Sequence, residues 1–267
     1  MTEMAAGHRA ANNPALGWLA RAGLVARGVV YAVIGVLALK LALGDGGKAT
    51  SQQGALKTIA HGSFGTFLLV LLAVGLAGYA LWRLTRAAVG HGAEQTDEPS
   101  DRVAAAASGI AYAILCVTAI KIVSGARAGS GGPRQATGGV LGWSGGTVIV
   151  AIAGLVLIGI GVYQFYKGVA RKFCEDSKTG EMSDTVRRAY TALGVAGHCA
   201  RAVVFALIGY GLIKAALDYD SKKAIGLDGA LRKLAHASYG PLLLGIVAAG
   251  LVMFAAYSIA DARYRKV

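Results

Sequence analysis

Long runs of apolar residues dominate this sequence, and several are long enough to cross a membrane as helices. A helix needs about 20 mostly apolar residues to span the roughly 30 Å hydrocarbon core of a bilayer. Four stretches satisfy this condition and contain no charged residue: 62–82, 103–120, 135–166 and 237–260. The Gly-rich start of the third stretch is expected to be loop. The pattern therefore predicts four spanning helices.

Two other apolar runs are interrupted by charged residues. The first, 22–43, contains Arg27 and Lys40, and the second, 193–217, contains an arginine, a lysine and a histidine. The Val, Ile, Leu and Ala content of both runs still predicts spanning helices. The sequence therefore predicts an all-α membrane protein with six transmembrane helices.

The six predicted helices form three copies of a two-helix unit. The phrase Ala-Arg-Gly-Val-Val-Tyr at 26–31 recurs as Ala-Arg-Ala-Val-Val-Phe at 200–205 and, more loosely, as Ala-Ser-Gly-Ile-Ala-Tyr at 107–112. A lysine follows nine residues after the aromatic residue in every copy, and the loops 54–61 and 229–236 also match. An aromatic residue aligns in the second helix of every copy: Trp82, Tyr163 and Tyr257. Because each copy spans the membrane twice, the repeats are parallel, and a pseudo-threefold axis along the membrane normal is the expected arrangement.

The middle copy differs from its neighbours. The loops that end at His61 and His236 place apolar residues three and four positions apart, which predicts short amphipathic helices on the membrane surface. In the middle copy, a Gly-rich stretch that ends at Trp143 takes this place, and Ser108 replaces the arginine of the repeated phrase. We therefore expect the middle copy to lack both the surface helix and the arginine.

The repeated phrase and its spacing resemble the bacterial membrane family called domain of unknown function 1206. Members of that family contain three tandem two-helix modules, each opening with an Ala-Arg-Gly-x-x-Tyr-like phrase. The resemblance extends from about residue 18 to residue 259; it is well kept at Arg27 and Arg201 and broken at Ser108. It implies the fold and a bacterial membrane location, and it brings no established activity, substrate or catalytic residue.

The predicted helices and repeats divide the chain into seven segments. These are an N-terminal cytoplasmic tail (1–17), the first repeat (18–90), an acidic linker (91–101), the degenerate second repeat (102–170), a basic cytoplasmic loop (171–188), the third repeat (189–260) and a cytoplasmic tail (261–267). The acidic cluster of the linker is Glu94, Asp97, Glu98 and Asp101.

Composition and charge support a bilayer environment. Apolar residues make up 55% of the chain and charged residues only 15%, against about 25% in soluble domains. The net charge of +13 could suggest nucleic acid, but the basic residues flank the apolar runs, where anionic head groups would meet them. Sixteen of the 27 Lys and Arg residues fall on the side of the two termini. The expected partner is therefore the bilayer of the cell membrane rather than nucleic acid, with both termini in the cytoplasm.

Two charged positions lie deeper than the head groups allow. Thirteen residues separate Arg27 from Lys40, and thirteen separate Arg201 from Lys214. At 1.5 Å per residue each pair is about 20 Å apart, less than the roughly 30 Å core. Long side chains that snorkel to the interface are the simplest explanation. The alternatives are a thinned bilayer, or arginines that face the helix bundle and bind carbonyls or an anionic ligand.

The candidate ligand or interior polar contacts combine the arginines, the aromatic residues that follow them, the equivalent lysines and two matched histidines. They are Arg27, Arg201, Tyr31, Tyr112, Lys40, Lys121, Lys214, His61 and His236. The histidines could serve a metal, haem or proton relay, but their place at the ends of the loops favours helix capping or interfacial hydrogen bonds. Three cysteines have no metal-ligand spacing. The sequence therefore indicates no metal site and no cofactor.

No catalytic motif is present in the sequence, so we expect a protein that is not an enzyme. No acidic residue lies inside a predicted span, and Asp261 is expected only to close the last helix, which argues against ion-coupled transport. The leading hypothesis is a scaffold or accessory subunit that contacts another membrane protein or forms a homo-oligomer. The alternatives are a channel or carrier for a small or anionic solute lined by the arginines and lysines, and a haem- or quinone-binding redox protein.

Overall fold

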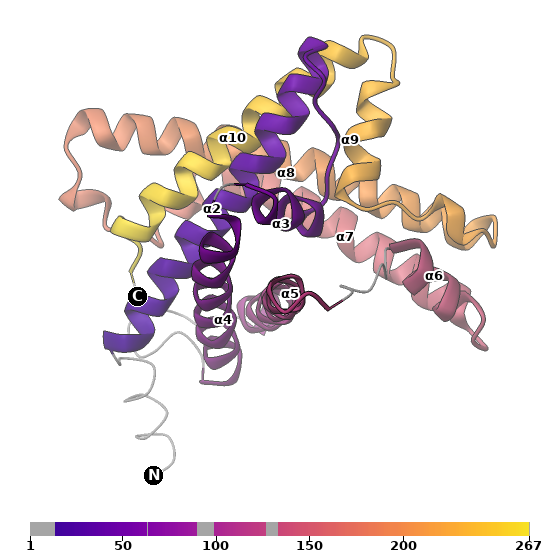
Figure 1. The fold of residues 1–267 in the computed structure, drawn as a ribbon, viewed down its shortest axis with the longest axis horizontal. Coiled ribbons are helices and arrows are strands. Elements are labelled where there is room, and N and C mark those ends of the chain that lie inside the picture. The colour runs from indigo at the N-terminus through magenta and orange to yellow at the C-terminus, as the bar shows by residue number, and fades with distance from the viewer. Residues whose placement is uncertain (1–13, 63, 90–98, 127–132, 267) are drawn as a thin grey trace. The chain divides into compact units, whose positions relative to one another are not determined.

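The computed structural model of the protein describes residues 14–62, 64–89, 99–126 and 133–266, and helices fill most of these ranges (Figure 1). Six of the described helices are long and apolar enough to cross a membrane: α2 (Pro14–Leu43), α4 (Gly65–Val89), α5 (Pro99–Val123), α7 (Gly146–Val169), α8 (Asp184–Leu217) and α10 (Gly240–Tyr264). The described ranges contain no strand. The predicted class, an all-α multi-pass membrane protein, is confirmed. The acidic residues Glu94, Asp97 and Glu98 and the tail up to residue 13 lie outside the described residues.

Three short helices each connect the two long helices of a repeat. They are α3 (Gln52–Ala60), α6 (Pro133–Leu141) and α9 (Leu227–Ala235), and each contains nine residues. The expectation that the middle repeat lacks this helix is therefore wrong. Proline at the first position of α6 presets the helical φ angle where a backbone N–H would have no partner, and Thr137 and Leu141, four residues apart, are buried on one face. These features outweigh Gly138 and Gly139, which each disfavour a helix by about 1 kcal/mol.

Helix α8 begins earlier than the sequence suggests. Its first residue is Asp184, so its first turn lies in the range 171–188, which was expected to be loop. The preceding Ser183 caps this helix, because its hydroxyl oxygen accepts a hydrogen bond from the Val186 N–H at 3.4 Å. The connection from α7 to α8 also contains two short 3₁₀ turns, η1 (Lys172–Cys174) and η2 (Thr179–Glu181).

The chain divides into two compact units. The first unit contains Met1–Val30, Leu56–Ala128 and Ser258–Val267, and the second contains Tyr31–Ala55 and Gly129–Tyr257. In the first unit, α4 packs along α5, and small residues let α2 approach α4 closely: a Cβ atom on Gly23 would lie 2.1 Å from Cβ of Tyr79.

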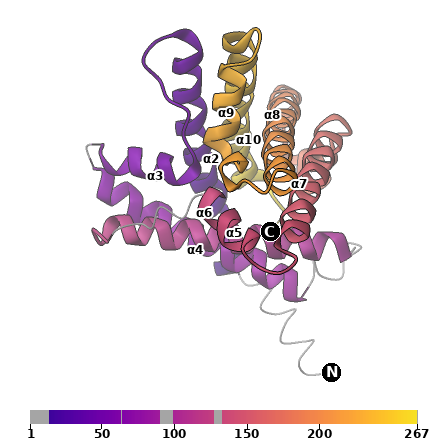
Figure 2. The same cartoon turned by 90° about the vertical axis from the view of Figure 1, so that its right-hand side faces the viewer.

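In the second unit, α7 and α8 lie side by side (Figure 2). Their backbones approach each other at Gly154 and Gly209, where a Cβ atom on either glycine would lie less than 3.0 Å from the carbonyl oxygen of the other. A cluster of rings fills the space between α8, α10 and η1. His198 stacks on Phe173 at 5.3 Å and meets Tyr257 edge to face at 5.5 Å. These close contacts set the depth and rotation of α8, on which the candidate site depends.

Candidate functional site

Arg27, in the first half of α2, lies inside the first unit with a full set of partners. The residue is only 8% exposed; Nε donates to Ser258 Oγ at 3.1 Å and Nη1 donates to Tyr79 Oη at 3.3 Å. Nη2 lies 3.8 Å from Oδ2 of Asp261, a carboxylate with no exposed surface. Arg27 is therefore a buried, hydrogen-bonded and charge-compensated residue. Its guanidinium contacts side chains of α4 and α10, so this arginine faces neighbouring helices of the first unit.

Two further arginines complete this cluster. Arg265 lies 3.4 Å from the same Asp261 oxygen, and Nε of Arg83 donates to Tyr79 Oη at 3.2 Å. A buried carboxylate is costly unless it is paired, so Asp261 and its two arginines stabilise one another. We call this group, consisting of Arg27, Tyr79, Arg83, Ser258, Asp261 and Arg265, the Arg27 cluster.

Asp261 is a residue whose role the sequence reasoning missed. It was expected only to close the last helix, but α10 continues to Tyr264, so Asp261 lies within a helix and is fully buried. The signal was present in the spacing: Ser258, Asp261 and Arg265 recur at intervals of three and four residues on one helix face. That face carries a polar stripe in an otherwise apolar helix, and a polar stripe requires a polar partner.

Arg201 occupies the equivalent position of the third repeat, in α8 of the second unit, and its surroundings differ. Aromatic rings surround its guanidinium carbon, which lies 4.5 Å from the ring centre of Phe254, 5.4 Å from that of Phe205 and 5.7 Å from that of Tyr31. The side-chain oxygen of Gln164, in the amide orientation that its neighbours require, accepts from Nη1 at 2.8 Å and from Nη2 at 3.2 Å. Within the described ranges, no carboxylate lies within 4 Å of Arg201.

The partners of the two arginines are themselves equivalent in the repeat. Tyr79 lies three residues before the aligned aromatic Trp82, and Phe254 lies three residues before the aligned Tyr257. Each contacts the arginine of its own repeat. Gln164 and Ser258 each lie one residue after the aligned aromatic of their repeat. Gln164 of the second repeat hydrogen-bonds Arg201 of the third, and Ser258 of the third repeat hydrogen-bonds Arg27 of the first. The two surroundings are therefore built from the same positions. Among the residues that the structure describes, only the Arg27 cluster adds a carboxylate.

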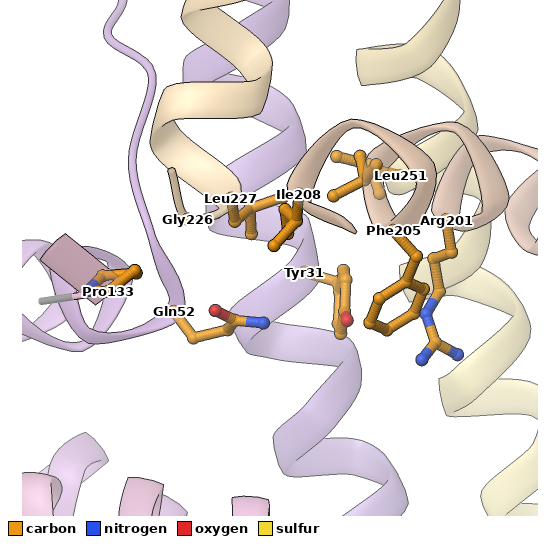
Figure 3. A pocket seen from close by; sticks show the side chains of 10 residues that line it. Tyr31, Gln52, Pro133, Arg201, Phe205, Ile208, Gly226, Leu227 and Leu251 are labelled. Carbon is orange, nitrogen blue, oxygen red and sulfur yellow. The ribbon is translucent and has the colours of Figure 1, made fainter. Parts of the chain in front are cut away.

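A cavity of about 230 Å³ opens beside Arg201. Figure 3 shows Arg201, Phe205 and Tyr31 on one side of this cavity and Gln52 and Pro133 on the other. The remaining lining residues are Val204, Ile208, Gly226, Leu227 and Leu251. The wall is thus mostly apolar, and its polar side-chain groups are one cation, one amide and the hydroxyl of Tyr31. We call this cavity the Arg201 pocket.

The other predicted residues take separate places. Tyr112 packs edge to face on Tyr79 at 4.7 Å, and Tyr31 packs in the same way on Phe254 at 4.9 Å. The three equivalent lysines, Lys40, Lys121 and Lys214, have exposed side chains and do not line the Arg201 pocket. The aromatic residues therefore support the two arginine sites, whereas the lysines do not belong to either.

The matched histidines lie at the ends of short helices. Nδ1 of His61 is 2.6 Å from the carbonyl oxygen of Lys57, and Nδ1 of His236 is 2.8 Å from that of Arg232. Each imidazole thus caps the last turn of its own helix, α3 or α9, and both are exposed. In the part of the chain that the structure describes, no three His, Cys, Asp or Glu side chains form a group that could hold a metal ion.

Comparison with known proteins identifies the repeats. The family model described as Domain of Unknown Function (DUF1206) matches three times, at residues 22–90, 103–171 and 196–265. An uncharacterized protein of Bacillus subtilis (strain 168), YxxB, is 34% identical over 250 residues, which cover 92% of this chain and 90% of that protein. No solved structure matches. Three matches over most of the chain, one for each two-helix repeat, show that the chain belongs to the DUF1206 family.

Proposed function

We propose that this membrane protein binds a small anionic ligand in the Arg201 pocket and does not catalyse a reaction on it. The observation that carries the proposal is the unmatched charge: Arg201 lines a cavity and is held by rings and an amide, while its counterpart Arg27 is neutralised by Asp261. A guanidinium held among apolar side chains without a carboxylate is unfavourable, because its charge is poorly solvated there. An anion in the cavity would remove that cost.

The shape and lining of the pocket limit the ligand. A volume of about 230 Å³ is below the usual range for drug-sized ligands and corresponds to roughly eight water molecules. The apolar wall suits a short aliphatic or aromatic body, and Arg201 suits a carboxylate, which accepts two parallel hydrogen bonds from a guanidinium. The lining residues include no nucleophile next to a general base, which supports binding without catalysis.

The binding test uses the purified full-length protein and benzoate and hexanoate as probes, followed by isothermal titration calorimetry. Arg201→Gln should weaken binding at least tenfold, because a hydrogen bond to a charged group contributes about 1.5–3 kcal/mol. Arg188→Gln, which removes the same charge from an exposed position of the same helix, should leave binding unchanged. Benzamide, a neutral analogue of similar shape, should not bind. Benzoate that binds both variants as tightly as the original protein would refute the proposal.

Binding is also the first requirement of a carrier for an anionic solute. If proteoliposomes containing the protein take up the same probe, and Arg201→Gln abolishes the uptake while Arg188→Gln does not, the proposal extends from binding to transport. The scaffold hypothesis receives less support from the geometry. The exposed apolar side chains of α4, α5 and α7 suit lipid chains as well as a partner helix.

We also propose that the protein resides in the bacterial cell membrane with both termini in the cytoplasm. The support is the distribution of Lys and Arg, sixteen of 27 of which fall on the side of the termini, as the positive-inside rule requires. Cysteine-labelling from outside intact cells tests this: a cysteine placed at Ser221 should react with a membrane-impermeant maleimide, and one placed at Thr179 should not.

A further inference from the structure

A second cavity, independent of the Arg201 pocket, lies beside the last turn of α8. It is a groove of about 490 Å³ bordered by α6, α8, α9 and the 3₁₀ turn η3 (Ser221–Lys223). Six cationic side chains line it: Arg134, Lys214, Lys222, Lys223, Arg232 and Lys233. We call it the basic groove.

The positive charge of the basic groove exceeds the negative charge beside it. Asp218 lies 2.6 Å from the Lys223 ammonium and 3.9 Å from that of Lys214, and Asp228 lies 3.6 Å from Arg232. The hydrogen bond to Asp218 raises the pKa of Lys223, which stays charged. The three other cations have no carboxylate within 4 Å in the described part of the chain: Arg134, Lys222 and Lys233.

The groove contains many of the basic residues that lie on the side of the membrane opposite the termini, which is the side with fewer Lys and Arg residues. Eleven of the 27 Lys and Arg residues fall on the side opposite the termini, and six of those eleven line this groove. The positive-inside rule predicts few Lys and Arg residues on the side opposite the termini. Their concentration in one groove on that side therefore indicates an anionic partner.

Neighbouring side chains place the groove at the level of lipid head groups. Helix α8 ends at Leu217, which is 75% exposed, and Tyr219, two residues later, is 65% exposed. Tyrosine is enriched where the hydrocarbon core meets water. Helix α9 packs Leu227 and Leu231 against the protein and exposes Arg232 and Lys233, so its basic face is available to head groups.

We propose that the basic groove binds the phosphate group of an anionic phospholipid in the leaflet on this side of the membrane. Lysine and arginine donate charge-assisted hydrogen bonds to phosphate oxygens, and each cation at a membrane surface strengthens binding of anionic lipid by about fivefold. The acyl chains then lie along the exposed apolar end of α8.

Native mass spectrometry of the full-length protein in detergent, titrated with phosphatidylglycerol or phosphatidylcholine, tests this proposal. Phosphatidylglycerol should bind at least tenfold more tightly than phosphatidylcholine. The triple variant Arg134→Gln, Lys222→Gln, Lys233→Gln should weaken phosphatidylglycerol binding by about 100-fold, and Lys222→Gln alone by about fivefold. Arg201→Gln should leave it unchanged, because the groove does not include that residue.

A matched control removes three positive charges near the opposite end of α8, two from the connection before it and one from its first turns: Lys172→Gln, Lys178→Gln, Arg188→Gln. It should retain phosphatidylglycerol binding. Equal losses in both triple variants, or no preference for phosphatidylglycerol in the original protein, would overturn the proposal. Full displacement of the lipid by millimolar inorganic phosphate would also overturn it, because the ligand would then be free phosphate.

Discussion

Arg27 and Arg201 occupy the same position of a repeat, yet their surroundings differ. The charge of Arg27 is neutralised by a carboxylate, whereas Arg201 lines a cavity and has no carboxylate beside it in the described residues. Both contact an aromatic residue of their own repeat and a polar residue of the preceding one. The difference comes from Asp261, which lies 3.8 Å from Arg27 and has no counterpart beside Arg201 in the described residues. A single carboxylate thus separates the neutralised arginine from the one that we propose binds an anion.

The middle repeat extends this comparison. It has Ser108 in place of the arginine, but the position equivalent to Gln164 and Ser258 is Arg83 in the preceding helix, and Arg83 donates to Tyr79 Oη at 3.2 Å. Tyr112, four residues after Ser108, packs on the same Tyr79 ring. A guanidinium is therefore present at this place as well, but it comes from the second helix of the first repeat and not from the first helix of the middle repeat.

The largest effect should follow from removing the carboxylate that distinguishes the two sites. Asp261→Asn leaves Arg27 and Arg265 charged and without their counter-ion, which should lower the free energy of unfolding by about 3–5 kcal/mol. Thermal unfolding of the purified protein in detergent measures the loss. Asp184→Asn, which breaks the exposed pair with Arg187, should cost under about 1 kcal/mol. Equal stability of Asp261→Asn and the original protein would contradict the assignment of the Arg27 cluster.

The shared helix packing of the two repeats predicts an intermediate effect at matched glycines. A Cβ atom on Gly23 would lie 2.1 Å from Tyr79 Cβ, and one on the equivalent Gly197 would lie 2.7 Å from Phe254 Cα. Each Gly→Ala change should therefore destabilise the protein by about 1–3 kcal/mol. Gly159→Ala meets no atom within 4 Å and should stabilise α7 by up to about 1 kcal/mol. Identical unfolding temperatures for all three variants would show that these helices do not approach closely.

Making the Arg201 pocket resemble the Arg27 cluster should abolish its affinity for anions. Gln164→Glu places a carboxylate where the amide oxygen now lies 2.8 Å from Nη1 of Arg201. Benzoate affinity, measured by calorimetry, should fall at least tenfold, since the pocket would already contain an anion. Gln135→Glu, the same change on the exposed surface of α6, is the control and should bind benzoate as before. If Gln164→Glu bound benzoate unchanged, the free charge of Arg201 would not be what attracts the anion.

The smallest effect is expected at the capping histidines. His61→Ala and His236→Ala each remove one exposed hydrogen bond to a carbonyl of the same helix, so unfolding should change by about 0.5 kcal/mol or less. The same variants test the redox hypothesis, because visible absorbance that is present in the original protein and lost in either variant would assign these residues to a bound haem.

Much of the fold could be predicted from local patterns. The six spans and the three repeats follow from apolar length and recurring phrases, which act within one helix. The short helix α6 was missed because its glycines suggested loop, whereas proline at its start and two residues buried on one face stabilise it. The candidate site was predicted in part: both arginines and the aromatic residues that follow them were identified, but Gln164 and Asp261 were not.

The sequence by itself determined that this is a membrane protein of three two-helix repeats, because the length and hydrophobicity of a span and the recurrence of a phrase are local properties. Only the tertiary structure decided which arginine is neutralised. Arg27 and its hydrogen-bond acceptor Ser258 are 231 positions apart, and their contact depends on the depth and rotation at which α10 packs against α2. A shift of one residue in that packing would turn Asp261 to another helix face. Charge compensation is therefore a property of the packed helices and not of any one of them.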